Sequence, residues 1–101
     1  MRKSGLTLAE IQSWGGIEVF KQAMESAGKG KVLAVAYDAD TRTISGEFYT
    51  HASGFVMPVS FKLKENGGVE SHCPCYQNQV LGRICEHVVA LGIGQYVLEM
   101  D

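Results

Sequence analysis

The residues best suited to chemistry in this chain are three cysteines and a histidine gathered close together in its C-terminal third. They are Cys73, Cys75, Cys85 and His87, and their pattern is C-x-C, nine residues, C-x-H. Thiolates and a neutral imidazole are ligands that zinc prefers, and four of them complete a tetrahedral shell with bonds of about 2.0 to 2.3 Å. The pattern therefore predicts one structural Zn²⁺ bound by these four side chains.

Two other interpretations compete with this ligand set. Buried cysteine often acts as a small hydrophobe, and a core histidine can be satisfied by ordinary hydrogen bonds, so packing alone could explain all four residues. His72 is a competing ligand because it adjoins Cys73. In an extended segment, however, adjacent side chains point to opposite faces. We therefore expect His72 to be exposed to solvent.

The elements that position these residues begin with a helical segment. Thr7 and Glu10 have the spacing of a capping box, in which the two side chains satisfy N–H groups of the first helical turn. The pair Gly15-Gly16 interrupts the segment. The second half is predicted to bury one apolar stripe and to end at Gly28; the stripe comprises Ile17, Phe20, Met24 and Ala27.

The middle of the chain changes to a period of two, which is typical of strands. The predicted strands are 31–37, 43–49, 55–64 and 69–75. A polar turn at 38–42 joins the first two, and the third has the clearest alternation of apolar and polar residues. This third strand contains Pro58, which cannot donate to a ladder. We expect this strand to lie at an edge, or the N–H side of Pro58 to face solvent.

These elements predict an α+β fold in a single domain, 1–101. N-terminal helices (1–28) pack on a small antiparallel sheet (29–70), and a zinc-clamped strand, turn and helix (71–101) follows. Cys73 and Cys75 share one face of an extended segment. Cys85 and His87 fall at the start of the last helix, where the partial positive charge favours thiolates.

The chain resembles the SWIM zinc finger family. The resemblance is carried by the CxCx(n)CxH arrangement, the apolar run 88–91 after the histidine, the strand entry Gly30-Lys31-Val32, and the hairpin residues Ser45-Gly46-Glu47. It covers Gly28 to Gln95. The resemblance implies that Cys73, Cys75, Cys85 and His87 bind one zinc, and that the module binds DNA or another protein, in some relatives beside helicase-like ATPases or transposases.

One departure from the family concerns nucleic-acid binding. Many members carry a basic residue between the last cysteine and the histidine, and this chain has Glu86 there. The remaining basic candidates are Lys62, Lys64 and Arg83, which could position a phosphate backbone if the fold gathers them. A protein-interaction adaptor is the alternative, and its surface would be the apolar last helix, with Val89, Ile93, Tyr96, Val97, Leu98 and Met100.

Composition, charge and missing motifs exclude several classes of protein. The 101 residues carry a formal charge of −2, so the net field would not attract a polyanion. No apolar run reaches the roughly 18 residues of a membrane span, and the cysteines are too few and too clustered for a disulfide framework. We expect an intracellular protein without membrane partners. The motifs of zinc deaminases and phosphate-binding loops are missing from the sequence, and we expect no catalysis by this chain.

Overall fold

A computed structural model describes residues 5–50, 55–65, 68–74, 79–80 and 84–99. Its four strands form one antiparallel sheet in the order β1-β2-β3-β4. The strands are β1 (Val32–Asp38), β2 (Thr43–Thr50), β3 (Phe55–Leu63) and β4 (Val69–His72). The predicted α+β class is confirmed, and the predicted turn between the first two strands is confirmed as well.

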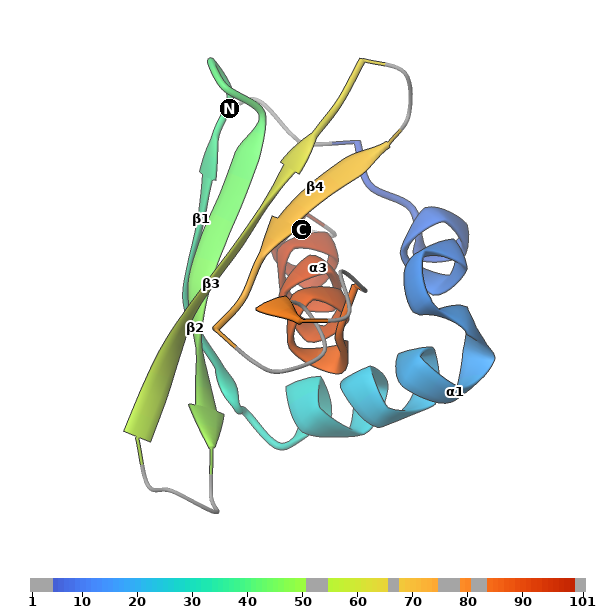
Figure 1. Cartoon of the computed structure of the whole chain (residues 1–101), viewed down its shortest axis with the longest axis vertical. Helices are drawn as coiled ribbons and strands as arrows, with labels where there is room; N and C mark the ends of the chain where they lie inside the picture. The colour runs from blue at the N-terminus through green and yellow to red at the C-terminus, as the bar shows by residue number, and fades with distance from the viewer. Residues whose placement is uncertain (1–4, 51–54, 66–67, 75–78, 81–83, 100–101) are drawn as a thin grey trace.

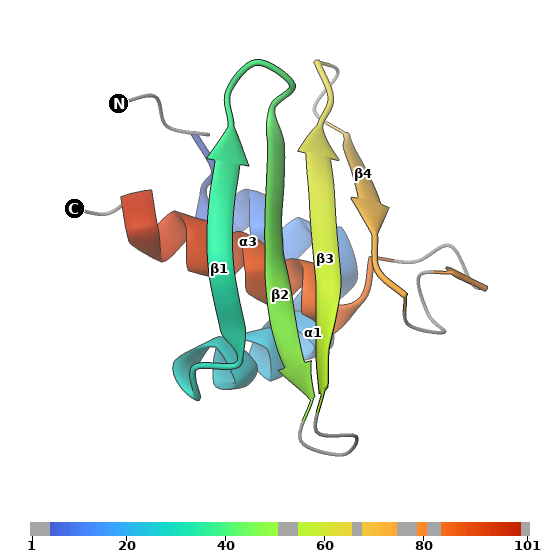
Figure 2. The same cartoon turned by 90° about the vertical axis from the view of Figure 1, so that its left-hand side faces the viewer.

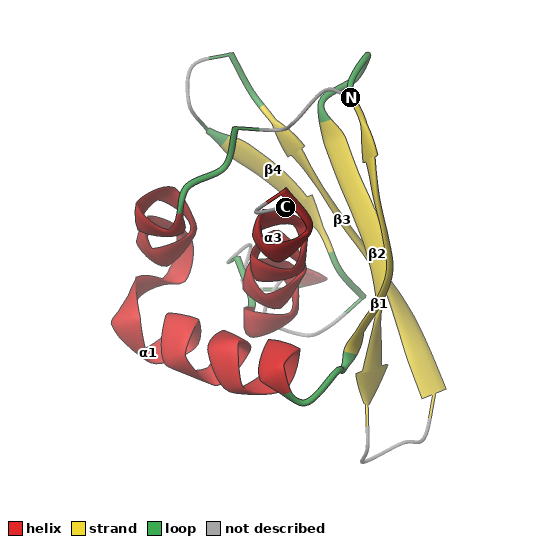
Figure 3. Ribbon diagram, turned by 180° about the vertical axis from the view of Figure 1, so that it is seen from behind, coloured by secondary structure: helices red, strands yellow, loops and turns green. Residues whose placement is uncertain are grey.

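Both long helices lie on the same face of this sheet. They are α1 (Leu8–Gly28) and α3 (Glu86–Glu99). α3 lies between the sheet and α1 (Figures 1 and 3), and Figure 2 shows it crossing behind the strands while no described element covers the opposite face. Among the described residues, neither helix has the length and apolar character needed to cross a bilayer.

The core occupies the space between the sheet and the helices. Alternation along the strands buries Ile44 and Phe48 of β2 and leaves Ser45 and Glu47 exposed. The same alternation in β3 buries Met57, Val59, Phe61 and Leu63. α3 is apolar over most of its circumference because it contacts the sheet on one side and α1 on the other, and residues 88–93 are all buried.

The N-terminal helix differs in phase from the sequence expectation. Thr7 caps it as predicted, since its hydroxyl oxygen accepts a hydrogen bond from the Glu10 N–H at 3.2 Å. The Glu10 carboxylate, the other half of the predicted box, accepts from the Thr7 hydroxyl at 3.2 Å. Gly16 then adopts φ 85° and ψ 174° inside the helix and kinks it. The kink rotates the second half, so Ile17 and Met24 are 49% and 46% exposed. The face turned inward carries Val19, Phe20, Ala23, Ser26 and Ala27.

Gly46 lets α3 approach the sheet closely. The β1–β2 register shifts between Leu33 and Ala36, a β-bulge within which Ala34 has φ 53°. A Cβ atom on Gly46 would lie 2.6 Å from Leu91 Cδ1 and 3.1 Å from the Leu33 carbonyl oxygen. Any larger residue at this position would therefore push the bulge and α3 apart.

Candidate metal centre

Two cysteines and a histidine from separate elements converge on one point of the core. The ligand atoms of Cys73, Cys85 and His87 all lie within 4.8 Å of one another. The Cys73 Sγ is 3.5 Å from the His87 Nδ1. Both cysteines are 1% exposed, whereas His87 is half-buried. The spacing in the sequence predicted the three residues as neighbours, and the structure brings them together.

Cys73 points into the core because it continues the inward face of β4. Val69 and Ser71 pair with the buried residues Leu63 and Phe61 of β3, so the next odd position faces the same way. Gln79 secures the backbone at this point, since its Nε2 donates to the Cys73 carbonyl oxygen at 2.9 Å. His72 is exposed, as predicted, and lies on the opposite face.

Two prolines, Pro58 in β3 and Pro74 after β4, end the β3–β4 ladder beside the cluster. The register pairs Ser60 with His72, and its continuation places Pro58 opposite Pro74. Leu63 N donates to Arg42 O across the β2 side of β3, so alternation puts the Pro58 nitrogen on the β4 side. Since neither proline has an N–H group, pairing stops at His72 and the chain leaves the sheet directly after Cys73.

The expectation that the strand containing Pro58 lies at an edge of the sheet is wrong. β3 is an inner strand, because β2 and β4 pair with its two sides. β4 nevertheless reaches only as far as Ser60, so the edge of β3 beside Pro58 has no strand partner among the described residues. The alternative expectation was that the nitrogen side of Pro58 faces solvent; Pro58 is exposed as a residue, and β4 gives that side no ladder partner among the described residues.

Cys85 and His87 are positioned by the first turn of α3. Cys85 immediately precedes the helix, and its carbonyl oxygen accepts the Val89 N–H at 3.2 Å. His87 follows on the first turn, with its ring packed edge-on against Phe48 of β2 at a centroid distance of 4.6 Å. The buried residues Val88 and Leu91 fix the orientation of this turn against the core.

The donor types and the separation between Cys73 and His87 fit a tetrahedral metal ion. Bonds of about 2.0 to 2.3 Å in a tetrahedral zinc site separate sulfur and nitrogen ligand atoms by about 3.5 Å. The 3.5 Å between Cys73 Sγ and His87 Nδ1 agrees with that separation. Cys75, the fourth ligand that the sequence predicts, lies outside the described residues.

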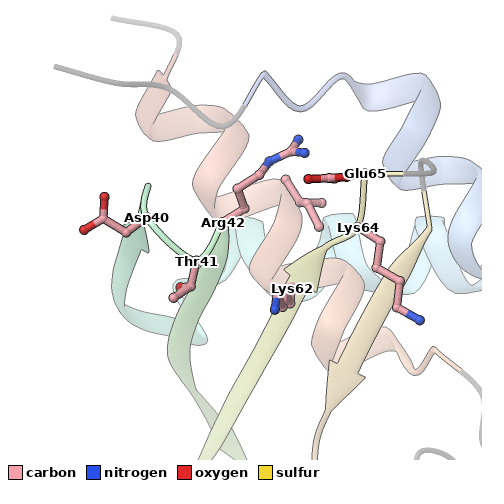
Figure 4. A pocket seen from close by; sticks show the side chains of 7 residues that line it. Asp40, Thr41, Arg42, Lys62, Lys64 and Glu65 are labelled. Atoms are coloured by element: carbon pink, nitrogen blue, oxygen red, sulfur yellow. The ribbon is translucent and has the colours of Figure 1, made fainter.

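A second group of residues gathers where the β1–β2 turn meets the end of β3. Arg42 of the turn lines a concavity of about 630 Å³ together with Lys62 and Lys64 (Figure 4). Asp40 and Glu65 also line it, so it carries a small excess of positive charge. Arg83, which the sequence grouped with the two lysines, lies outside the described residues.

Arg42 was not among the sequence candidates. It has φ 55° in the turn, and its place beside the two lysines depends on the antiparallel pairing that sets residue 42 opposite Leu63. The polar turn residues gave no separate sign of this role. Once β2 and β3 are paired as neighbours, their register alone locates Arg42.

No protein-family model, no curated protein and no solved structure matches this chain.

Proposed function

We propose that the chain is a structural zinc-binding module of the SWIM type, in which Cys73, Cys75, Cys85 and His87 bind one Zn²⁺. The observation that carries the proposal is the convergence of two buried thiols and one imidazole nitrogen within 4.8 Å, from the end of β4 and the start of α3. Cys75, two residues after Cys73 in the sequence, supplies the fourth ligand of the proposed set.

The same donor set supports a structural role and not a catalytic one. Four protein ligands fill a tetrahedral shell and leave no position for water or substrate, whereas catalytic zinc keeps one position open. Bound in this way, the ion links the C-terminal end of β4 to the first turn of α3. It thereby joins the sheet to the central helix at the point where the β3–β4 ladder stops.

Cobalt binding by ligand variants tests this proposal. Co²⁺ occupies zinc sites and reports thiolate ligands and tetrahedral geometry by its absorption spectrum. We expect the reduced wild-type chain to bind one Co²⁺ with both signatures, and Zn²⁺ to displace it. Cys85→Ala should lose tight binding, because it removes one buried ligand of the cluster.

His72→Ala is the matched control for the ligand variants. His72 adjoins Cys73 but is exposed on the other face of the sheet, so its loss should leave the cobalt spectrum and affinity unchanged. Equal binding by Cys85→Ala and the wild type would refute the ligand assignment. A wild-type chain that binds no Co²⁺ would leave a thiol-imidazole hydrogen bond as the explanation of the 3.5 Å contact.

We further propose that the module binds the phosphate backbone of nucleic acid through Arg42, Lys62 and Lys64. All three are exposed around one concavity, and no ion pair involves any of them within the described part of the chain. Asp40 and Glu65 share the concavity, and the chain is acidic overall. Binding should therefore be weak and strongly reduced by salt.

Binding of a short labelled DNA duplex at rising salt concentration tests this surface. The triple variant Arg42→Gln, Lys62→Gln, Lys64→Gln should lose most of the affinity and should flatten the salt dependence. The matched control neutralises Lys21, Lys29 and Lys31, which lie on α1 and before β1. It changes the net charge of the chain by the same amount as the first triple variant. Equal losses in both variants would contradict a local site.

A salt-insensitive association with protein would favour the adaptor alternative instead. Its surface is an apolar groove of about 390 Å³ between the end of α1, β1 and the last turns of α3. Val97 and Leu98 border it and are 54% and 58% exposed, whereas Val89 and Ile93, which the sequence also placed on this surface, are buried because that side of α3 packs in the core. Val97→Ser should then abolish the association, and the triple basic variant should not affect it.

A further inference from the structure

The orientation of the His87 imidazole is set from outside the zinc-binding segment. Its Nδ1 is the nitrogen that lies 3.5 Å from Cys73 Sγ. The ring also meets Phe48 in an edge arrangement, with centroids 4.6 Å apart and planes inclined at 62°. A histidine side chain can present either nitrogen to a metal, and the two nitrogens lie at different distances from its Cβ. The neighbouring ring therefore affects which nitrogen reaches the cluster.

Phe48 is itself held firmly by the sheet. It is 5% exposed on the inward face of β2, where it pairs with Val32 of β1 and Met57 of β3. Its position therefore does not depend on the chain between residues 73 and 87. The buried Phe48 ring lies beside the first turn of α3, and the His87 imidazole packs against it.

We propose that Phe48 is a positioning residue of the metal centre, which holds His87 so that Nδ1 and not Nε2 is the metal ligand. This inference rests on the proposed zinc centre and adds to it a specific nitrogen and a residue from β2. Groups that orient a histidine ligand commonly change metal affinity by about 10- to 100-fold when they are removed. An aromatic edge contact can serve the same purpose as a hydrogen bond, because it restricts rotation of the ring.

The experiment compares Phe48→Leu with Phe61→Leu in the full-length chain. Phe61 is a matched control: it is 1% exposed in β3 and packs edge-on against Trp14 at a centroid distance of 5.0 Å, and no ring contact joins it to His87. Both variants replace a buried phenylalanine in an aromatic pair by the same smaller residue. We expect Co²⁺ affinity to fall on the order of tenfold or more in Phe48→Leu only, with a changed ligand-field spectrum.

A second measurement needs no variant. In the zinc-loaded wild-type chain, two-bond ¹H–¹⁵N correlation spectra identify the imidazole nitrogen that carries a proton. We expect a protonated Nε2 and a metal-bound Nδ1. Coordination through Nε2, or equal cobalt affinity and spectra for Phe48→Leu and Phe61→Leu, would overturn the inference while leaving the zinc centre intact. A wild-type chain that binds no metal would overturn both.

Discussion

At the residue scale, the cluster forms because single side chains at its border restrict the backbone. Pro58 and Pro74 remove the next hydrogen bonds of the β3–β4 ladder, so the chain departs from the sheet beside Cys73. Gly46 allows α3, which begins beside Cys85, to pack directly on β2. These residues contribute no ligand atom, yet they decide where the two sulfur atoms lie.

Gly46→Ala should destabilise the fold by about 1 to 3 kcal/mol, because the new methyl group would overpack the contact between Leu91 and the Leu33 carbonyl. The free energy of unfolding from urea titration measures this change. Gly28→Ala is the control, since a Cβ there meets nothing within 4 Å. It should be neutral or stabilise by up to about 1 kcal/mol. Equal stability of the two variants would show that α3 does not need the glycine.

The clustering of Cys73, Cys85 and His87 was predictable from the sequence because these residue types are rare and their spacing is short. Cys73, Cys85 and His87 were found from the C-x-C and C-x-H pairs, and the exposure of His72 followed from strand alternation. The role of Phe48 was not predictable. The residue lies 39 positions before His87, and only the packing of α3 across β2 brings the two rings together.

At the element scale, three of the four strands were predicted within one residue of their observed bounds, whereas the fourth, predicted as 69–75, ends at His72. Alternation is a local property, and a sheet covered on one face preserves it strictly, as β2 and β3 show. α1 was harder. The spacing of Ile17 and Met24 indicated a buried stripe, but it could not include the change of phase at Gly16, because that angle depends on how both halves pack around α3.

Strand order was the other feature that the sequence did not predict. Pro58 suggested an edge strand, whereas β3 lies inside the sheet. The physical reason is the shortness of β4, which spans only Val69–His72 and leaves the proline end of β3 uncovered by it. The length of a partner strand is a tertiary property. The same dependence on strand pairing explains why Arg42 was not grouped with Lys62 and Lys64 from the sequence.

At the scale of the whole molecule, the fold is compact, but the strand that leads to the cluster is short. The radius of gyration is 12.4 Å, close to the value of about 13 Å typical of 100 residues. β4, the strand that leads to Cys73, nevertheless has only four residues in the sheet. Structural zinc in small fingers supplies apparent binding free energy on the order of 10 kcal/mol, comparable to the stability of an entire domain. A metal ion at Cys73, Cys85 and His87 would therefore make the largest single contribution to the stability with which β4 and α3 pack together.

The most direct test is the metal content of the full chain purified without added metal, by elemental analysis, followed by chelation monitored by circular dichroism. The bound zinc is predicted to equal one ion per chain, and its removal is predicted to disrupt the packing of β4 and α3 on the rest of the core. A reduced, folded chain that contains no zinc and is unaffected by the chelator would contradict the structural zinc centre.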